Sequence, residues 1–409
     1  MVKQGRPAVI SLFTGAMGLD LGFEKEEFNI KVALDIDAYA AETIRKNRPR
    51  IPVMNRDISN VETKEILETA GLTVGEAAVV TGGSPCQPFS TAGRRLSVNE
   101  MKGQLIFEFI RVVEEAKPKF FVFENVAGLI SAAIKHISFY ERIRKKEEEL
   151  PPEQRLGSAF EIILDRFRKT HYGLSFGVLN AADYGVPQRR KRLIILGSRE
   201  GKKVILPQAT HGSLGSDGVL NGSKKTWTTL REALKDLKDP GFEHIRFPPS
   251  RRKYMRHIPQ GGDWRDLPVD LQKEAMKGAY YSQGGRTGFF RRLSWDEPAP
   301  TLATSPVYKG TTLAHPKEDR PLSVREYARI QGFPDDWEFV GYISTKYRLI
   351  GEAVPIQLSR ALARQILQEL KRESGTDNET NRQMQENGKR IISLRAPIPR
   401  FSPNVGVKD

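Results

Sequence analysis

Short apolar runs alternate with amphipathic stretches through the first 200 residues, and this alternation limits the possible folds more than any other feature of the chain. The runs that we expect to be strands are residues 8–13, 31–34, 77–81, 119–123, 174–179 and 193–197. Between them, residues 105–115 and 158–168 place their apolar side chains on one helical face. Strands that alternate with helices are typical of a doubly wound α/β fold with a mostly parallel sheet.

Polar and glycine residues come directly after several of these runs. Gly15 and Gly18 follow the first run, Asp35 follows the second, Cys86 comes after the third and Glu124 after the fourth. Ligands of open α/β sheets bind outside the carboxyl ends of the strands. The sequence therefore predicts that one edge of the sheet is the functional edge.

The alternation fades between residues 198 and 291, where basic residues are interleaved with aromatic ones. This mixture of basic and aromatic residues predicts a smaller, irregular domain that faces nucleic acid. The alternative interpretation is a solvated insertion. Regular patterning returns with expected helices at 324–331 and 354–372. We therefore expect a catalytic domain at 1–197, a recognition domain at 198–291, a return to the catalytic domain at 292–372 and a polar tail at 373–409, of which residues 391–394 could dock as a strand.

Composition narrows the class of partner and of site. The 409 residues suffice for two domains, and the net charge of +15 favours a polyanionic partner. A single cysteine excludes an internal disulfide and a multi-cysteine zinc site, so we expect no bound metal. No signal-like segment and no long apolar run is present, which favours a cytoplasmic protein that does not span a membrane.

The lone cysteine lies in an unusually stiff loop. Residues 83–90 read GSPCQPFS, so two prolines bracket Cys86 directly after a strand that ends in two glycines. Such a frame holds a thiol at the sheet edge, where nearby positive charge would make it a reactive thiolate. Glu124 directly follows the run at 119–123. It is a candidate general acid, because burial would raise its pKa.

Basic residues precede the last expected strand. In an extended segment, Gln188, Arg190 and Arg192 would share one face, opposite Arg189 and Lys191. Arginines in this arrangement could hold a base carbonyl, a phosphate or a thiolate. A solvated basic run is the alternative.

The glycine-rich turn at residues 13–18, followed by an acid after the next strand, suits a nucleoside ligand whose ribose hydroxyls the acid would bind. The same pattern would fit a nicotinamide enzyme, although nothing else in the chain supports hydride transfer.

In order and over nearly the whole chain, these segments resemble the cytosine-5 DNA methyltransferase family of prokaryotic restriction–modification type. The matching segments are residues 13–18, 35, 56–58, 82–90, 102–105, 124–126, 188–192, 291–301, 321–333 and 351–355. The resemblance implies a Rossmann-like, S-adenosylmethionine-dependent catalytic domain and a target-recognition domain. It also implies duplex DNA as substrate, with the target cytosine flipped out of the helix.

The resemblance also assigns roles. Cys86 would attack C6 of cytosine, Glu124 would protonate N3, and Arg190 would contact the base and support the thiolate. C5 would then accept the methyl group of S-adenosylmethionine. The residues implied at the substrate are Gln87, Ser90, Asn125, Gln188 and Arg192, and the loop at residues 90–102 would close over the site.

For S-adenosylmethionine, the resemblance implies contacts from Phe13, Gly15, Gly18, Asp35, Asp57, Ile58, Pro85, Leu105 and Val354. The chain departs from the family pattern at two positions. Met17 replaces a glycine, so the loop could sit differently around the methionine moiety. Glu352 stands where the family usually has asparagine, which puts the expected cofactor contact of that position in doubt.

Two other functions remain open from the sequence. One is a tRNA cytosine-5 methyltransferase, and the other is a catalytically inactive DNA-binding subunit. We expect a monomer that acts on double-stranded DNA in the cytoplasm, associated with the nucleoid through its substrate. A cognate restriction endonuclease would belong to the same system without forming a stable complex.

Overall fold

The computed structural model describes residues 5–85, 101–135, 137, 139–239, 241–281 and 287–373. The chain divides into two compact units, Met1–Gln365 and Ile366–Asp409. The sheet and the candidate site lie in the first unit. The strand expected at residues 391–394 falls outside the described residues.

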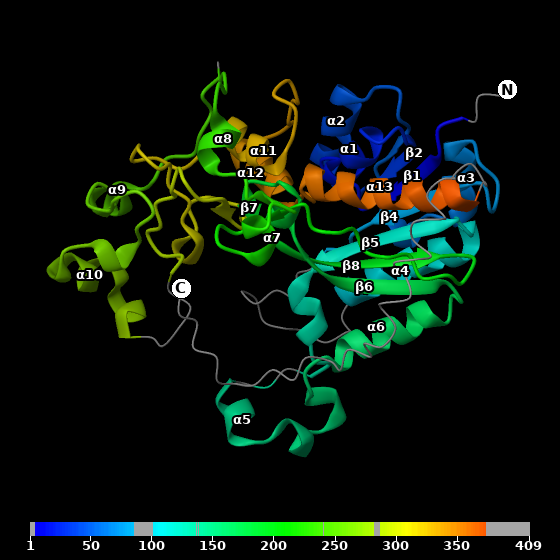
Figure 1. The fold of residues 1–409 in the computed structure, drawn as a ribbon, viewed down its shortest axis with the longest axis horizontal. Helices are drawn as coiled ribbons and strands as arrows, with labels where there is room; N and C mark the ends of the chain where they lie inside the picture. The colour runs from blue at the N-terminus through cyan, green and yellow to red at the C-terminus, as the bar shows by residue number, and fades with distance from the viewer. Residues whose placement is uncertain are drawn as a thin grey trace. The chain divides into compact units, whose positions relative to one another are not determined.

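A seven-stranded sheet forms the centre of the first unit (Figure 1). From edge to edge its strands are β3 (Val53–Met54), β2 (Asn29–Leu34), β1 (Ala8–Leu12), β4 (Val79–Gly82), β5 (Phe120–Val126), β8 (Lys191–Ser198) and β6 (Gly173–Asn180). The pairs from β3 to β5 are parallel, whereas β8 is antiparallel to both β5 and β6. The predicted doubly wound, mostly parallel α/β fold is confirmed, and all six expected runs are strands.

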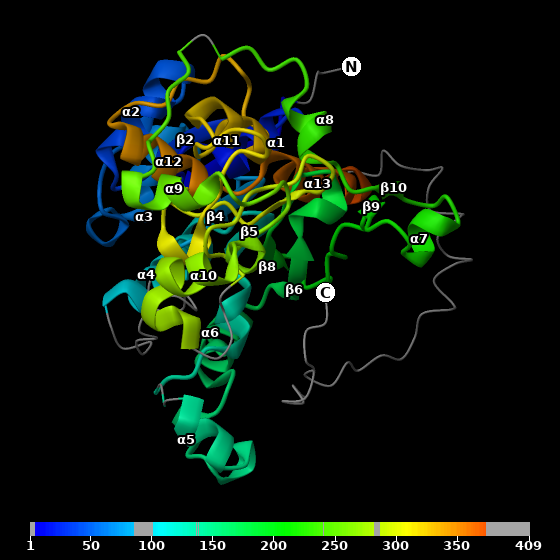
Figure 2. The same ribbon diagram turned by 90° about the vertical axis from the view of Figure 1, so that its left-hand side faces the viewer.

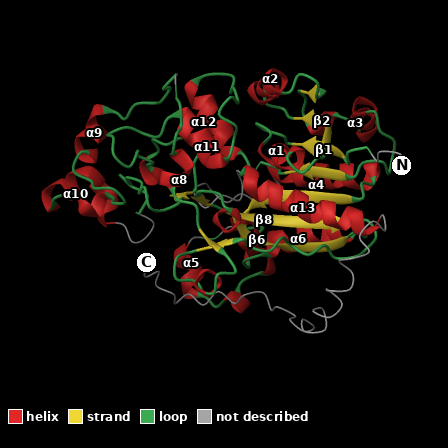
Figure 3. Ribbon diagram, turned by 45° about the horizontal axis from the view of Figure 1, so that its top comes forward, coloured by secondary structure: helices red, strands yellow, loops and turns green. Residues whose placement is uncertain are grey.

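Helices α3 (Thr63–Ala70), α4 (Met101–Ala116) and α6 (Ser158–Arg168) share one hydrophobic core with the sheet. Phe109 of α4 lies at its centre, with ring centroids 5.0 Å from Phe123 and 6.0 Å from Phe121. The amphipathic spacing of α4 and α6 places Phe109 and Phe167 on the helix faces that meet the rings of β5. Figure 3 shows the strands side by side with helices packed around them.

The remaining helices near the sheet follow β1 and β2 or return from the end of the first unit. They are α1 (Gly18–Glu24), α2 (Ala38–Asn47), α11 (Val324–Gln331), α12 (Ile343–Glu352) and α13 (Ile356–Glu373). The start of α13 is fixed to α1, because the Ser359 hydroxyl donates a hydrogen bond to the Leu19 carbonyl. This hydrogen bond joins residues 340 positions apart and holds the late part of the first unit against its beginning.

Short elements characterise the middle of the chain. They are β7 (Gln188–Arg189), β9 (His211–Gly212), α7 (Asp217–Leu220), β10 (Lys225–Thr226), α8 (Leu230–Leu234), α9 (Pro249–Met255), α10 (Val269–Met276) and β11 (Ala299–Pro300). A second hydrophobic cluster joins residues of α9 and α10 to others of this region, among them Trp264 and Phe290. Figure 1 shows these two helices apart from the sheet. A separate core favours a second domain here, and its boundaries stay a prediction.

One lobe was not expected from the sequence. The turned view in Figure 2 shows α5 (Phe139–Arg144) in a projection that extends beyond α6. Hydrogen bonds from Arg142 to Glu147 and to the Gln154 carbonyl hold this lobe together. In the part of the chain that the structure describes, no helix is long and apolar enough to cross a membrane.

Candidate active site

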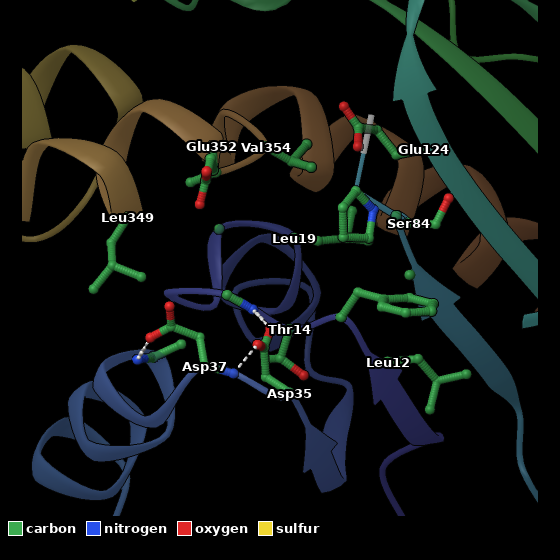
Figure 4. Close-up of a pocket in the computed structure, with 18 of the residues that line it drawn as sticks. Leu12, Thr14, Leu19, Asp35, Asp37, Ser84, Glu124, Leu349, Glu352 and Val354 are labelled. Atoms are coloured by element: carbon green, nitrogen blue, oxygen red, sulfur yellow. Dashed lines mark hydrogen bonds between the residues drawn. The ribbon is translucent and has the colours of Figure 1, made fainter. Parts of the chain in front are cut away.

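A cavity of about 620 Å³ opens at the carboxyl ends of β1, β2, β4 and β5 (Figure 4). Thirteen residues singled out from the sequence line it, namely Phe13, Gly15, Gly18, Asp35, Asp57, Ile58, Pro85, Leu105, Glu124, Asn125, Arg190, Arg192 and Val354. Gln188 is buried and is not part of the lining. Cys86, Gln87 and Ser90 lie outside the described residues, as does most of the loop at residues 90–102. Pro85, the residue before Cys86, is part of the cavity wall.

The glycine-rich turn is held by the carboxylate of Asp35. Its Oδ2 atom accepts a hydrogen bond of 2.7 Å from the Gly15 amide, and its Oδ1 atom accepts one of 2.8 Å from the Asp37 amide (Figure 4). Each oxygen keeps a second lone pair for a ligand hydroxyl. A side chain at Gly18 would clash with the backbone oxygen of Val354, so this close approach requires glycine. These contacts shape one end of the cavity, called the donor end below.

Met17 adopts a left-handed backbone conformation with φ of 67° directly before α1. Glycine adopts this conformation without strain, whereas a side-chain-bearing residue does so at an energetic cost. The Met17 side chain is fully buried, and its burial offsets part of that cost. The chain thus keeps the backbone geometry of a glycine turn with a methionine in it.

Glu124 lies at the opposite end of the cavity, called the catalytic end below. It is buried on β5, and its Oε1 atom forms an ion pair of 2.7 Å with Nε of Arg192. Burial raises the pKa of Glu124, and the charges of Arg192 and Arg190 act in the opposite direction. Glu124 is therefore a buried carboxyl with a raised pKa, as expected. Its ion pair with Arg192 was not predicted from the sequence.

The segment at residues 188–192 has the alternation expected of an extended strand. Gln188 and Arg190 are buried and Arg192 nearly so, while Arg189 and Lys191 are exposed. The prediction that the first three residues share a face is confirmed.

The three buried side chains of this segment have different partners. Arg190 donates hydrogen bonds to the backbone oxygens of Leu302, at 3.0 Å, and of Gly351, at 2.7 Å. Gln188 bonds to Gln331 and to the Leu302 amide. Arg192 alone contacts the carboxylate of Glu124. Arg192 is therefore the arginine of this segment that pairs with Glu124, whereas Arg190 ties together the backbone segments at Leu302 and Gly351.

Asn125 connects the end of β5 to the cysteine loop. Its Nδ2 atom donates to the carbonyl and hydroxyl oxygens of Ser84, at 3.3 and 3.4 Å, and its Oδ1 atom accepts from the Val126 amide. These bonds fix the chain two residues before Cys86. Asn125 is therefore suited to orienting the loop.

Several cavity residues escaped the sequence reasoning. Arg348 of α12 donates to Asp37, at 2.5 Å, and to Glu352, at 3.1 Å, so it bridges two carboxylates far apart in the chain. Ile36 lines the cavity although 67% of it is exposed. Asp20 also lines the cavity as a fully buried carboxyl. The spacing of Arg348 and Glu352 on one helix was the only signal available for the first of these.

We expect the substitution Gly83→Ala to lower the activity of this site by about tenfold or more without unfolding the protein. A Cβ atom at Gly83 would lie 2.7 Å from Oε2 of Glu124 and 2.9 Å from its backbone oxygen, so the carboxyl must move. A displacement of about 1 Å in a catalytic group can cost about 10²-fold in rate. Single-turnover rates would measure the effect, with Gly241→Ala as control, because no atom of the described residues beyond its chain neighbours lies within 4 Å of a Cβ there. Unchanged rates in the Gly83 variant would contradict the packing argument.

Comparison with known proteins agrees with this geometry. The family model described as C-5 cytosine-specific DNA methylase matches residues 8–368. Type II methyltransferase M.Eco47II of Escherichia coli is 39% identical over 365 residues, which are 88% of this chain and 78% of that protein. Type II methyltransferase M.PspPI of Psychrobacter sp. (strain TA137) is 38% identical over 369 residues, 89% of this chain and 79% of that protein.

Solved structures share the fold at lower identity. A prophage-encoded E. coli protein described as a DNA modification methyltransferase has a TM-score of 0.59 at 23% identity, covering 89% of this chain and 99% of that one. The S. pombe Dnmt2 methyltransferase has a TM-score of 0.56 at 17% identity, with 89% and 99% covered.

The fold and the cavity define a Rossmann-like protein with a cavity at the carboxyl edge of its sheet, which is where ligands of such folds bind. The chain belongs to the C-5 cytosine-specific DNA methylase family and is a DNA (cytosine-5) methyltransferase. Within the described ranges, no group of three or more histidine, cysteine, aspartate and glutamate side chains is arranged to hold a metal ion.

Proposed function

We propose that this methyltransferase transfers the methyl group of S-adenosylmethionine to C5 of a flipped-out cytosine in a specific duplex DNA sequence, through a covalent adduct between Cys86 and C6. The observation that carries the proposal is the buried Glu124–Arg192 pair in the same cavity as the Asp35-braced glycine turn. One end of the cavity is thus suited to a nucleoside donor and the other to an acid-dependent reaction. Pro85, one residue before the proposed nucleophile, also lines this cavity.

The donor end fits S-adenosylmethionine in size and chemistry. A cavity of about 620 Å³ lies within the usual range for small-molecule sites. Asp35 would bind the ribose hydroxyls with its free lone pairs, Asp57 and Ile58 would lie at the adenine, and Gly15 and Gly18 allow close approach of the methionine part. When bound, the donor supplies an electrophilic methyl group on a sulfonium.

The catalytic end would activate the base. The Cys86 thiolate adds to C6 and forms a carbon–sulfur bond, while the Glu124 carboxyl places its proton at N3. The electrons released toward C5 make that carbon nucleophilic, and loss of the C5 proton later expels the cysteine. The guanidinium of Arg192 holds the Glu124 carboxyl group in place and stabilises the carboxylate that forms when the proton is given up.

Arg190 takes a supporting role in this proposal. Two of its nitrogens are already bonded to the Leu302 and Gly351 carbonyls, which belong to the segments that return to the catalytic body after residue 291. Its buried charge still lies close enough to Glu124 to lower the pKa of that acid. Arg190 therefore fixes the wall against which the flipped cytosine would rest.

Sequence recognition is assigned to the smaller domain, proposed at residues 198–291. Its separate hydrophobic cluster and its basic and aromatic side chains support this division. The relatives named Type II methyltransferases support a role in a restriction–modification system. We also propose that the enzyme acts as a monomer, and that any cognate endonuclease acts on the same sites without a stable complex.

Parallel methylation assays test the proposed function. Purified protein is incubated with radiolabelled S-adenosylmethionine and, separately, plasmid DNA or tRNA, and labelling of DNA alone is expected. A duplex with 5-fluorocytosine at the mapped target should trap a denaturation-resistant adduct, because C5 then carries no removable proton. The Cys86→Ala protein should form no adduct. Exclusive tRNA labelling, or DNA binding with no labelling and no adduct, would overturn the proposal.

A further inference from the structure

The formal charges around the cavity are distributed unevenly between its two ends. The donor end is lined by the carboxylates Asp35, Asp37, Asp57 and Glu352 and by the guanidinium groups of Arg56 and Arg348. Arg56 forms an ion pair with Glu65, which lies outside the cavity. Of these two arginines, Arg348 is the one that pairs with donor-end carboxylates, namely Asp37 and Glu352. Four carboxylates therefore face one such arginine, and the donor end carries a net negative charge.

The catalytic end has the opposite balance. Two arginines, Arg190 and Arg192, face one carboxylate, Glu124. A cavity that is negative at one end and positive at the other favours a cation at the first and an anion at the second. Glu352 adds one negative charge to the donor end and shares Arg348 with Asp37, so Arg348 cannot fully neutralise either carboxylate.

Glu352 ends α12 and directs its carboxylate into the cavity, facing Asp35 and Asp37 on the opposite wall (Figure 4). Its side chain is 52% exposed, so a ligand can approach it. Burial and the charges of Asp37 and Asp35 raise the pKa of Glu352, while Arg348 lowers it. The negative charges of Asp35, Asp37 and Glu352 therefore repel one another at this end of the cavity.

We propose that the charge of Glu352 strengthens cofactor specificity, so that the donor end binds the cationic S-adenosylmethionine in preference to the neutral product S-adenosylhomocysteine. This inference rests on the proposed function, because it assumes that the donor occupies this end of the cavity. The two molecules differ only by one methyl group and by the positive charge on sulfur. A side chain that attracts this charge favours binding of the substrate and release of the product.

The alternative role of Glu352 is a hydrogen bond to a hydroxyl or ammonium group. Both cofactors carry these groups, so the loss of such a bond would weaken their binding equally. An electrostatic role weakens only the sulfonium form. In a partly solvated site, the expected difference is about fivefold to tenfold in the ratio of dissociation constants.

Calorimetric titration at pH 8 of the wild-type protein with each cofactor separates these roles. In the Glu352→Gln variant, the dissociation constant for S-adenosylmethionine is expected to rise by about fivefold or more while that for S-adenosylhomocysteine stays within about twofold. Glu352→Asp keeps the charge and should retain most of the preference. Glu338→Gln removes an exposed carboxylate that pairs with Lys46 and does not line the cavity, and it should change neither constant.

Each outcome has a distinct meaning. An equal loss of affinity for both cofactors in Glu352→Gln, or no loss for either, would overturn the charge-based role. If wild-type protein binds neither cofactor, the proposed use of S-adenosylmethionine fails instead.

Discussion

Replacing Glu124 with glutamine is expected to lower the rate of methyl transfer by about 10² to 10⁴-fold, the usual contribution of a general acid. Glutamine has nearly the same shape and can still donate a hydrogen bond to N3 of cytosine, but it cannot transfer a proton. The addition of the thiolate at C6 then builds negative charge on the base without the proton that would neutralise it. Binding of DNA and of S-adenosylmethionine should remain close to wild type.

The pH dependence of this reaction follows from the environment of Glu124. Burial raises its pKa, so a larger fraction of the carboxyl carries the required proton near neutrality than at an exposed glutamate. The protonated form is present below this pKa and is lost as the pH rises through it. The thiolate of Cys86 changes in the opposite direction, so the rate profile should be bell-shaped. The limb that belongs to Glu124 should disappear in the Glu124→Gln variant.

Single-turnover rates between pH 5 and 9, with circular dichroism to verify folding, would measure both effects. Glu114→Gln is a matched control, because Glu114 also pairs with an arginine, Arg166 at 2.6 Å, but does not line the cavity. A rate for Glu124→Gln within about threefold of wild type, far below the contribution of a general acid, would show that this carboxyl is not the acid.

The strand order of the sheet could be anticipated only in part. Runs such as 119–123 and 193–197 are apolar enough to be recognised as buried strands, and both are strands in the structure. Strand β3 has only two residues, Val53 and Met54, which is too short to stand out. The antiparallel direction of β8 was also hidden, because a fully buried strand has the same apolar pattern in either direction.

The candidate site shows a similar limit. Glu124 and the segment with Arg190 and Arg192 were found because their positions after a strand or along an extended segment predict their direction. Which arginine meets Glu124 depends on the antiparallel register of β5 and β8. The Asp37–Arg348 pair joins residues 311 positions apart, and no local pattern could connect them.

Asp20 was likewise invisible in the sequence, where a polar residue near the start of a helix is usually exposed. In the structure it is fully buried, neither of its carboxylate oxygens has a hydrogen-bond partner among the described residues, and burial raises its pKa to about 7. The charge of Glu24 acts in the same direction, while the hydroxyls of Ser11 and Thr81 lower the pKa. The folded protein therefore favours the protonated carboxyl.

We expect Asp20→Asn to stabilise the protein at pH 8 and to leave its stability nearly unchanged near pH 4. Below the unfolded pKa of 3.8, both states of Asp20 are protonated and the group contributes no pH-dependent penalty. As the pH rises from about 4 to 7, the unfolded chain loses the proton more readily than the folded one, so the wild type loses stability. Above pH 7 the penalty is constant and on the order of 4 kcal/mol, as the shift from 3.8 to about 7 implies.

Urea unfolding of both proteins at pH 5, 6, 7 and 8 measures this difference, because the other titrating groups contribute equally and cancel. The gain in unfolding free energy for Asp20→Asn should grow over this range and level off above pH 7, when the buried carboxyl of the wild type has ionised. Asp165→Asn is the control of opposite sign, since Lys169 lowers the pKa of the exposed Asp165 and its loss should not stabilise the protein. A gain for Asp20→Asn that is the same at pH 5 and pH 8 would mean that asparagine simply packs better, and that Asp20 does not hold a proton in the folded enzyme.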